Sequence, residues 1–177
     1  MVPVNIPQIN GINEITKSVI SKELYHFTLA LFSIPLYFHD KVILDLENQL
    51  FNTEINQFEV DIIGFYSFQK MEACRVLYGK PSSYLELEGI KTILKNELKE
   101  MRERRILEVN NNLHMTIAKT TYGSEFDASH LKDNVNCGTA LITEISLCKM
   151  GAVNGQYVKV LTFPLKPKHS ICKLKTV

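Results

Sequence analysis

Apolar and polar positions alternate in the segment YHFTLALF, residues 25–32. In an extended strand, successive side chains point to opposite faces. Phe27, Leu29 and Leu31 therefore share an apolar face, while His26, Thr28 and Ala30 share the other. The alternation predicts a strand with one buried face. An imidazole beside a hydroxyl fits two interpretations: a core histidine satisfied by a backbone carbonyl next to a threonine present for strand propensity, or a pair that does chemistry.

The same reading of periodicity predicts the remaining elements. Alternation and β-branched residues favour strands, and apolar positions three or four residues apart favour helices. Strands are expected over residues 1–7, 56–68, 72–80, 114–120, 139–150 and 155–165. The last two are expected to form a hairpin around Asn154-Gly155. Helices are expected over residues 10–21, 41–51 and 81–101. This order predicts an α+β domain with two pseudo-symmetric lobes around a mainly antiparallel sheet and helices outside it.

The longest predicted helix, residues 81–101, has a two-sided pattern. Its apolar positions run from Leu85 to Met101 at helical spacing and are expected to face the core. Lys91, Lys95 and Lys99 fall among the charged positions that are expected to face water.

A second copy of the strand motif occurs in the second half of the chain. HFTLA at residues 26–30 returns as HMTIA at residues 114–118, with the same order of histidine, apolar residue, threonine, apolar residue and alanine. With five histidines in the chain, the pattern arises by chance only on the order of a few thousandths of a time per chain. The repeat therefore favours a shared chemical role for the two segments.

Two such strands facing one cleft supply the groups needed to cleave a phosphodiester without a metal. An imidazole titrates at about pH 6.5 and can therefore gain or lose a proton near neutral pH. Of His26 and His114, one can accept a proton from the nucleophile while the other protonates the leaving oxygen. Thr28 and Thr116 can each donate a hydrogen bond to a non-bridging phosphate oxygen. No HxH or HExxH element is present, so no metal and no cofactor is expected.

With HFT and HMT, the chain resembles the two-histidine (2H) phosphoesterases, whose signature is a pair of H-x-[ST] tripeptides on two pseudo-symmetric strands. The stretch LHMTIAKT, followed by FDASHL and CGTALITEISLCKMGAVNGQYVKV, is similar to the end of the phosphoesterase-like domain of A-kinase anchoring proteins. The resemblance implies a 2H phosphoesterase fold over residues 1–165, followed by a basic tail over residues 166–177. It also implies catalytic roles for His26, Thr28, His114 and Thr116.

The resemblance further implies a phosphodiesterase, either a hydrolase or a lyase, that acts on short nucleotides. Members of the family open 2′,3′-cyclic phosphates, trim RNA ends or cleave 2′-5′ linkages, and several viral members destroy nucleotide messengers of innate immunity. Cyclic GMP-AMP and 2′-5′ oligoadenylates are the expected substrates, with a vicinal hydroxyl or water as the nucleophile. Two alternatives stay open: a non-catalytic module that binds an AMP-like nucleotide, and a 2′,3′-cyclic phosphodiesterase acting on RNA ends.

Base recognition calls for an aromatic platform near the cleft, because stacking contributes about 1–3 kcal/mol per base. The candidates are Tyr66 and Phe68, which precede a turn, and Tyr122, which follows the second motif. Each of the three also fits a core position. Lys119 and Lys149 are candidates for binding phosphate, or are lysines solvated at strand ends.

Composition narrows the class of partner. The 177 residues are 45% hydrophobic, and 20 Lys and Arg residues against 19 Asp and Glu residues give a net charge of +1. We therefore expect a single monomeric domain with a small nucleotide substrate. Neither duplex nucleic acid nor a membrane is an expected partner, because the charge is balanced and no long apolar span is present.

Cysteine usage and the N-terminal segment bear on the compartment. The four cysteines are widely spaced and form no CxxC pair, which is typical of reduced, packed thiols, and no apolar signal core follows the first residues. A cytoplasmic protein is expected. The abundant asparagine, isoleucine and lysine and the absence of tryptophan are compatible with an A/T-rich genome, such as that of many large DNA viruses, in which case the compartment is the host cytoplasm.

Overall fold

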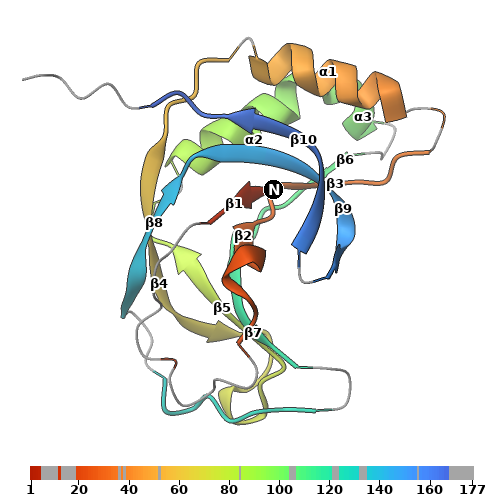
Figure 1. Cartoon of the computed structure of the whole chain (residues 1–177). Helices are drawn as coiled ribbons and strands as arrows, with labels where there is room; N and C mark the ends of the chain where they lie inside the picture. Colours follow the sequence, from red (N-terminus) through yellow and green to blue (C-terminus); the bar gives the residue numbers. More distant parts are fainter. Residues whose placement is uncertain are drawn as a thin grey trace, which may run out of the picture.

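The computed structural model describes residues 1–4, 12, 19–35, 37, 39–51, 53–83, 85–103, 107–120, 124–131, 135–154 and 156–167. A six-stranded sheet forms the centre of this part of the chain (Figure 1). Its strands lie in the order β1-β2-β7-β5-β4-β8, and every neighbouring pair is antiparallel. They span Val2–Pro3 (β1), His26–Phe27 (β2), Phe58–Ser67 (β4), Val76–Pro81 (β5), Met115–Lys119 (β7) and Asn136–Ile142 (β8). The sheet therefore places the two repeated motifs on adjacent central strands.

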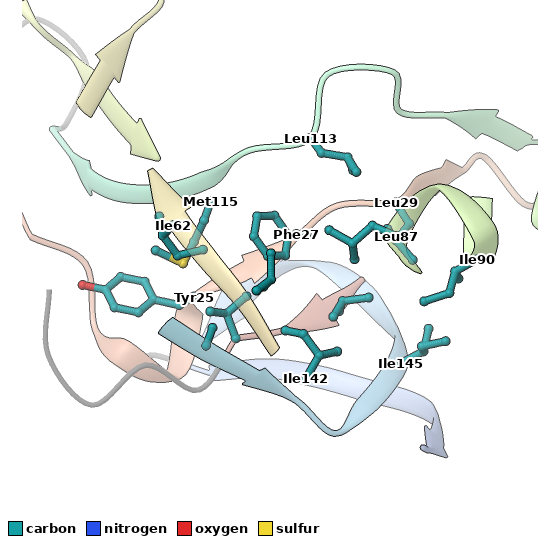
Figure 2. Close-up of a cluster of buried hydrophobic side chains, with 14 of the residues drawn as sticks. Tyr25, Phe27, Leu29, Ile62, Leu87, Ile90, Leu113, Met115, Ile142 and Ile145 are labelled. Carbon is teal, nitrogen blue, oxygen red and sulfur yellow. The ribbon is translucent and has the colours of Figure 1, made fainter. Parts of the chain in front are cut away.

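The helices gather at one end of the molecule (Figure 1). They are α1 (His39–Phe51), α2 (Leu85–Glu97) and α3 (Lys99–Glu103), and two single 3-10 turns cover Lys22–Leu24 (η2) and Met71–Ala73 (η4). Apolar side chains of α2 share one core with those of β2 and β7, as Figure 2 shows for Leu87, Phe27 and Met115. This arrangement confirms the predicted α+β class. No helix in the described part of the chain is long and apolar enough to cross a membrane.

The predicted strand over residues 25–32 is two strands. β2 ends at Phe27, and β3 (Ala30–Phe32) leaves the main sheet to pair with β6 (Leu107–Val109). Leu29 lies in the break and is still buried, but Leu31 in β3 is 43% exposed, so the predicted buried face does not extend to it. A pattern of buried positions cannot show that the hydrogen-bonding partner changes, which is why the sequence predicts one strand here.

The predicted strand over residues 139–150 is interrupted in the same way. β8 ends at Ile142 in the main sheet, and after Thr143 the chain continues as β9 (Glu144–Val153), which pairs with β10 (Gln156–Pro164). The hairpin predicted around Asn154 is confirmed by this pairing, and Asn154 has the positive φ of 53° that a tight turn requires. The β9–β10 hairpin forms a separate two-stranded sheet.

The predicted helix over residues 81–101 begins later and divides in two. α2 begins at Leu85 and is separated from α3 by Leu98. Leu87, Leu98 and Met101 are buried as predicted, but Leu85, the first residue of the helix, is 79% exposed.

Lys91 also departs from the prediction, because it is only 1% exposed. It lies four residues after Leu87 and three before Leu94, so it shares their inward face, and position on the helix decides its burial despite its charge. Its ammonium group donates a hydrogen bond of 2.5 Å to the carboxylate of Glu88, whose side chain reaches solvent.

Two predictions fall largely outside the described residues. The helix expected over residues 10–21 is described only at residues 12 and 19–21, where Val19 and Ile20 pair with β7. The tail expected from residue 166 is described only to residue 167, and the backbone of Lys166 pairs with Ile55 and Gln57.

The substitution Lys91→Met is expected to leave the free energy of unfolding unchanged or to raise it by up to about 1–4 kcal/mol, because a desolvated ammonium group is replaced by an apolar side chain of similar length. Urea unfolding followed by circular dichroism measures this change. Leu87→Ala, on the same face of α2, sets the scale with an expected loss of about 2–5 kcal/mol. A loss of more than about 1 kcal/mol for Lys91→Met would contradict the expectation.

Candidate active site

The two histidine motifs meet across β2 and β7, and the core decides which way their side chains point. Phe27 pairs directly with Met115 in the antiparallel register, and both side chains are fully buried. Because neighbouring residues in a strand face opposite sides, the motif residues on either side of this pair point away from the core. Continuing the register by one residue sets His26 opposite Thr116 and Thr28 opposite His114. The two imidazoles therefore lie diagonally across one small patch.

Both imidazoles are held in the same tautomer. Nδ1 of His26 donates a hydrogen bond of 2.7 Å to the carbonyl oxygen of Leu24, and Nδ1 of His114 donates one of 2.9 Å to that of Asn112. A carbonyl oxygen only accepts, so Nδ1 carries hydrogen in both rings and Nε2 is the nitrogen available for proton exchange. Nε2 of His26 lies 3.1 Å from Oγ1 of Thr28, which can donate to its lone pair. This arrangement suits acid and base catalysis at Nε2.

Burial distinguishes His26 from an ordinary histidine. Desolvation lowers its pKa below the usual 6.5, the hydrogen bond to the carbonyl of Leu24 opposes this, and charge repulsion from the N-terminal amino group and then from His114 adds to the lowering. The ring of Tyr157 covers His26 edge-on, with 4.9 Å between the ring centroids. His26 is therefore neutral near pH 7 and able to accept a proton.

Asn110 links the segments that carry the two motifs through hydrogen bonds. Its side-chain amide donates a hydrogen bond of 2.8 Å to the carbonyl oxygen of Thr28, and its side-chain oxygen accepts one of 3.0 Å from the backbone N–H of Asn112. Asn112 in turn orients His114 through its carbonyl group. Asn110 therefore positions the turn before the second motif against the end of the first. The sequence shows it only as the first of three consecutive asparagines and has no signal for this role.

An aromatic strip, formed by Tyr66, Tyr78 and Phe68, continues the site beyond His114. Ring centroids of Tyr66 and Tyr78 are 5.9 Å apart and those of Phe68 and Tyr78 are 4.6 Å apart, both stacked. Phe68 and Tyr78 lie 5.3 and 5.1 Å from the ring of His114. The predicted candidates Tyr66 and Phe68 are thus next to the second motif. Tyr78, which the sequence analysis missed, joins them because it pairs with Thr116 across β5 and β7.

A cavity of about 680 Å³ opens on the other side of the site, next to His26 and Thr28. Apolar side chains form most of its wall, with leucine the commonest, and Tyr157 of the β9–β10 hairpin also lines it. The predicted phosphate-binding residues Lys119 and Lys149 both line it. Tyr157 was not predicted, since its contact with His26 depends on how the separate β9–β10 sheet lies against β2.

Tyr122, the remaining predicted binding residue, lies outside the described residues. Within the described ranges, no group of three or more histidine, cysteine, aspartate or glutamate side chains lies close enough together to hold a metal ion. The chemistry that the described site offers is proton transfer between two imidazoles and hydrogen bonding from two hydroxyls.

Several solved structures have a similar fold. The chain is similar to TT0787 of Thermus thermophilus (TM-score 0.60, 16% identity, 86% of this chain and 84% of that chain) and to E. coli LigT complexed with 3′-AMP (TM-score 0.57, 14% identity, 83% and 80%). A structure described as a phosphoesterase has a TM-score of 0.54 at 16% identity and covers 84% of this chain and 81% of its own. At these identities the likeness concerns the fold. No curated protein sequence matches significantly.

The curled antiparallel sheet with two H-x-T motifs on adjacent strands is that of the 2H phosphoesterase superfamily, and the chain is a phosphoesterase in this broad sense. Within the superfamily, residues 7–165 match the model of the AKAP7 2′5′ RNA ligase-like domain. The chain belongs to this family.

Removing the amide of Asn110 is expected to impair catalysis. Asn110→Ala should lower kcat for a phosphodiester substrate by about 10- to 100-fold, because a displacement of His114 by a fraction of an ångström disturbs the alignment of the reacting atoms. Steady-state kinetics and thermal unfolding, measured together, separate this effect from a loss of fold. Asn111→Ala, at the exposed neighbouring position, is the matched control. Equal kcat values for the two variants would contradict the positioning role.

The lowered pKa of His26 can be observed directly. An NMR titration of its imidazole in the absence of ligand is expected to give a midpoint below 6.5, because the buried ring resists protonation as the pH falls. Tyr157→Ala exposes the ring and should move the midpoint up toward 6.5, whereas Tyr157→Phe keeps the covering ring and should not. A wild-type midpoint at or above 6.5 would show that burial does not keep His26 neutral.

Proposed function

We propose that the protein is a metal-independent phosphodiesterase that cleaves short nucleotides with 2′-5′ linkages, such as cyclic GMP-AMP or 2′-5′ oligoadenylates. The observation that supports it most is the pairing of two imidazoles, each with Nε2 available, with two threonine hydroxyls on one face of the sheet. The aromatic strip beside His114 provides stacking surface for a base. A cavity of this size suits a small ligand better than a polymer.

In this mechanism His26 is the general base and His114 the general acid. Neutral His26 accepts the proton of the attacking hydroxyl at Nε2 while that oxygen forms a bond to phosphorus. His114 enters this step as the imidazolium, with hydrogen on both ring nitrogens; the bond from phosphorus to the leaving oxygen breaks, and His114 donates its Nε2 proton to that oxygen and becomes neutral. The hydroxyl of Thr28 turns from His26 toward a non-bridging phosphate oxygen, and Thr116 donates to another, so both stabilise the charge that grows in the transition state.

The family to which the chain belongs supports the preference for a 2′-5′ linkage, because its description names a 2′5′ RNA ligase-like domain. In a 2′-5′-linked nucleotide, the free 3′-hydroxyl is adjacent to the phosphorus and can act as the nucleophile, which yields a 2′,3′-cyclic phosphate. Water is the alternative nucleophile. The role that we propose is that of a cytoplasmic monomer that removes such messengers, which in a virus would antagonise host nucleotide signalling.

Replacing either imidazole is expected to reduce turnover strongly. His26→Ala and His114→Ala should each lower kcat by about 10²–10⁴-fold while the protein stays folded, because each removes one proton-transfer group. His130→Ala, which changes an exposed histidine outside the site, is the matched control. Unchanged turnover in either of the first two variants would contradict the mechanism.

A second assay tests whether the reaction needs a metal and which linkage is cleaved. Wild-type protein is incubated in EDTA with 2′-5′-linked, 3′-5′-linked and 2′,3′-cyclic adenine nucleotides, and the products are identified by mass. Cleavage of the 2′-5′ linkage in EDTA is the expected result. Loss of activity in EDTA would show a metal requirement, and cleavage of only the 3′-5′ or cyclic substrates would show a different specificity.

A further inference from the structure

The two ends of the candidate site differ in what they offer a substrate. Beyond His114 lies the aromatic strip, in which Phe68 stacks on Tyr78 and is still 53% exposed. Beyond His26 lies the cavity, whose wall is mostly aliphatic and whose lysines are Lys119 and Lys149. One end therefore presents flat aromatic surface, and the other presents a deeper space lined by aliphatic and basic side chains.

The two reacting oxygens also lie on different sides of the phosphorus. In a displacement at phosphorus, the attacking and leaving oxygens lie roughly in line on opposite sides of the phosphorus atom. The base lies beside the attacking oxygen and the acid beside the leaving oxygen. With His26 as base and His114 as acid, the leaving group must depart on the side of the aromatic strip.

We propose that the substrate binds in a single orientation, in which the leaving nucleoside stacks on Phe68 of the aromatic strip and the retained nucleoside lies in the cavity beside His26. The inference rests on the proposed function and adds to it the direction in which the chain of the nucleotide runs. Phe68 and Tyr78 are then residues that determine specificity for the leaving group. The leaving group is a nucleoside that is linked to the phosphorus through its 5′-oxygen.

The contacts around the strip are consistent with this role. Tyr78 is 7% exposed and lies between Tyr66 and Phe68, so it supports the exposed ring from behind. The ammonium group of Lys80 lies 4.2 Å from the centre of the Tyr66 ring. The strip therefore presents the exposed ring of Phe68 beside Tyr78, while the ammonium group of Lys80 lies against Tyr66.

The test compares three substrates that differ only in their bases. The first is adenylyl-(2′-5′)-adenosine; in the second the base of the leaving nucleoside is replaced by a methoxy group, and in the third the base of the retained nucleoside is replaced in the same way. The ratio of kcat/KM for the first and second substrates is the leaving-base ratio. The corresponding ratio for the first and third substrates is the retained-base ratio.

Phe68→Ala is expected to lower the leaving-base ratio by about 5- to 150-fold, the range that loss of one stacking contact corresponds to, and to change the retained-base ratio less than twofold. Phe68→Tyr keeps an aromatic ring and should keep both ratios near the wild-type values. Leu141→Ala, an exposed apolar position on β8, controls for the loss of apolar surface elsewhere.

The outcomes are distinct. A fall in the retained-base ratio alone would reverse the orientation, and no change in either ratio would remove the aromatic strip from substrate binding; both results overturn the inference and leave the phosphodiesterase intact. If the wild-type protein cleaves none of the three substrates, the proposed function fails, and the inference fails with it.

Discussion

The site depends on one pair of core side chains. Phe27 of β2 and Met115 of β7 lie opposite each other, fully buried, at the centre of the sheet. Around them the odd-numbered neighbours are buried as well: Tyr25, Leu29, Leu113 and Ile117 (Figure 2 labels all but the last). A shift of one residue in this register would turn His26 and His114 into the core, where an unpaired imidazole is costly. The packing that stabilises the fold therefore also orients the side chains of the two motifs.

The two motifs are equal in sequence but unequal in their surroundings. Tyr157 and the neighbouring core desolvate His26, so its pKa falls, while His114 lies against the rings of Phe68 and Tyr78. Both rings are held through Nδ1 by a backbone carbonyl group. The local strand geometry thus supplies the common part of the mechanism. The elements packed against each strand give the two imidazoles different surroundings, and the proposed division into base and acid follows from that difference.

Much of this could be predicted from the sequence, because alternation reports which face of a strand is buried and the repeat reports that two strands share a role. The positions of His26, Thr28, His114 and Thr116 on one face follow from that reasoning. What it could not predict depends on which strands are neighbours. Tyr78 joins the site through its strand pairing with Thr116, and Tyr157 joins it through a ring contact made by the separate β9–β10 sheet. The breaks after β2 and β8 are changes of pairing partner, and Asn110 acts through hydrogen bonds that have no periodic signal. The prediction for Lys91 was wrong because its charge indicated exposure to water, whereas its position on the inward face of α2 buries it.

If the proposed mechanism is right, both motifs hold one phosphodiester between them. This can be examined in a crystal structure with a methylene phosphonate analogue of adenylyl-(2′-5′)-adenosine, in which the leaving oxygen is replaced and cleavage cannot occur. We expect phosphonate oxygens within about 3.2 Å of the hydroxyls of Thr28 and Thr116, with Nε2 of His26 and of His114 on opposite sides of the phosphorus. A phosphonate group that contacts only one motif, or that lies away from both, would contradict the proposed mechanism.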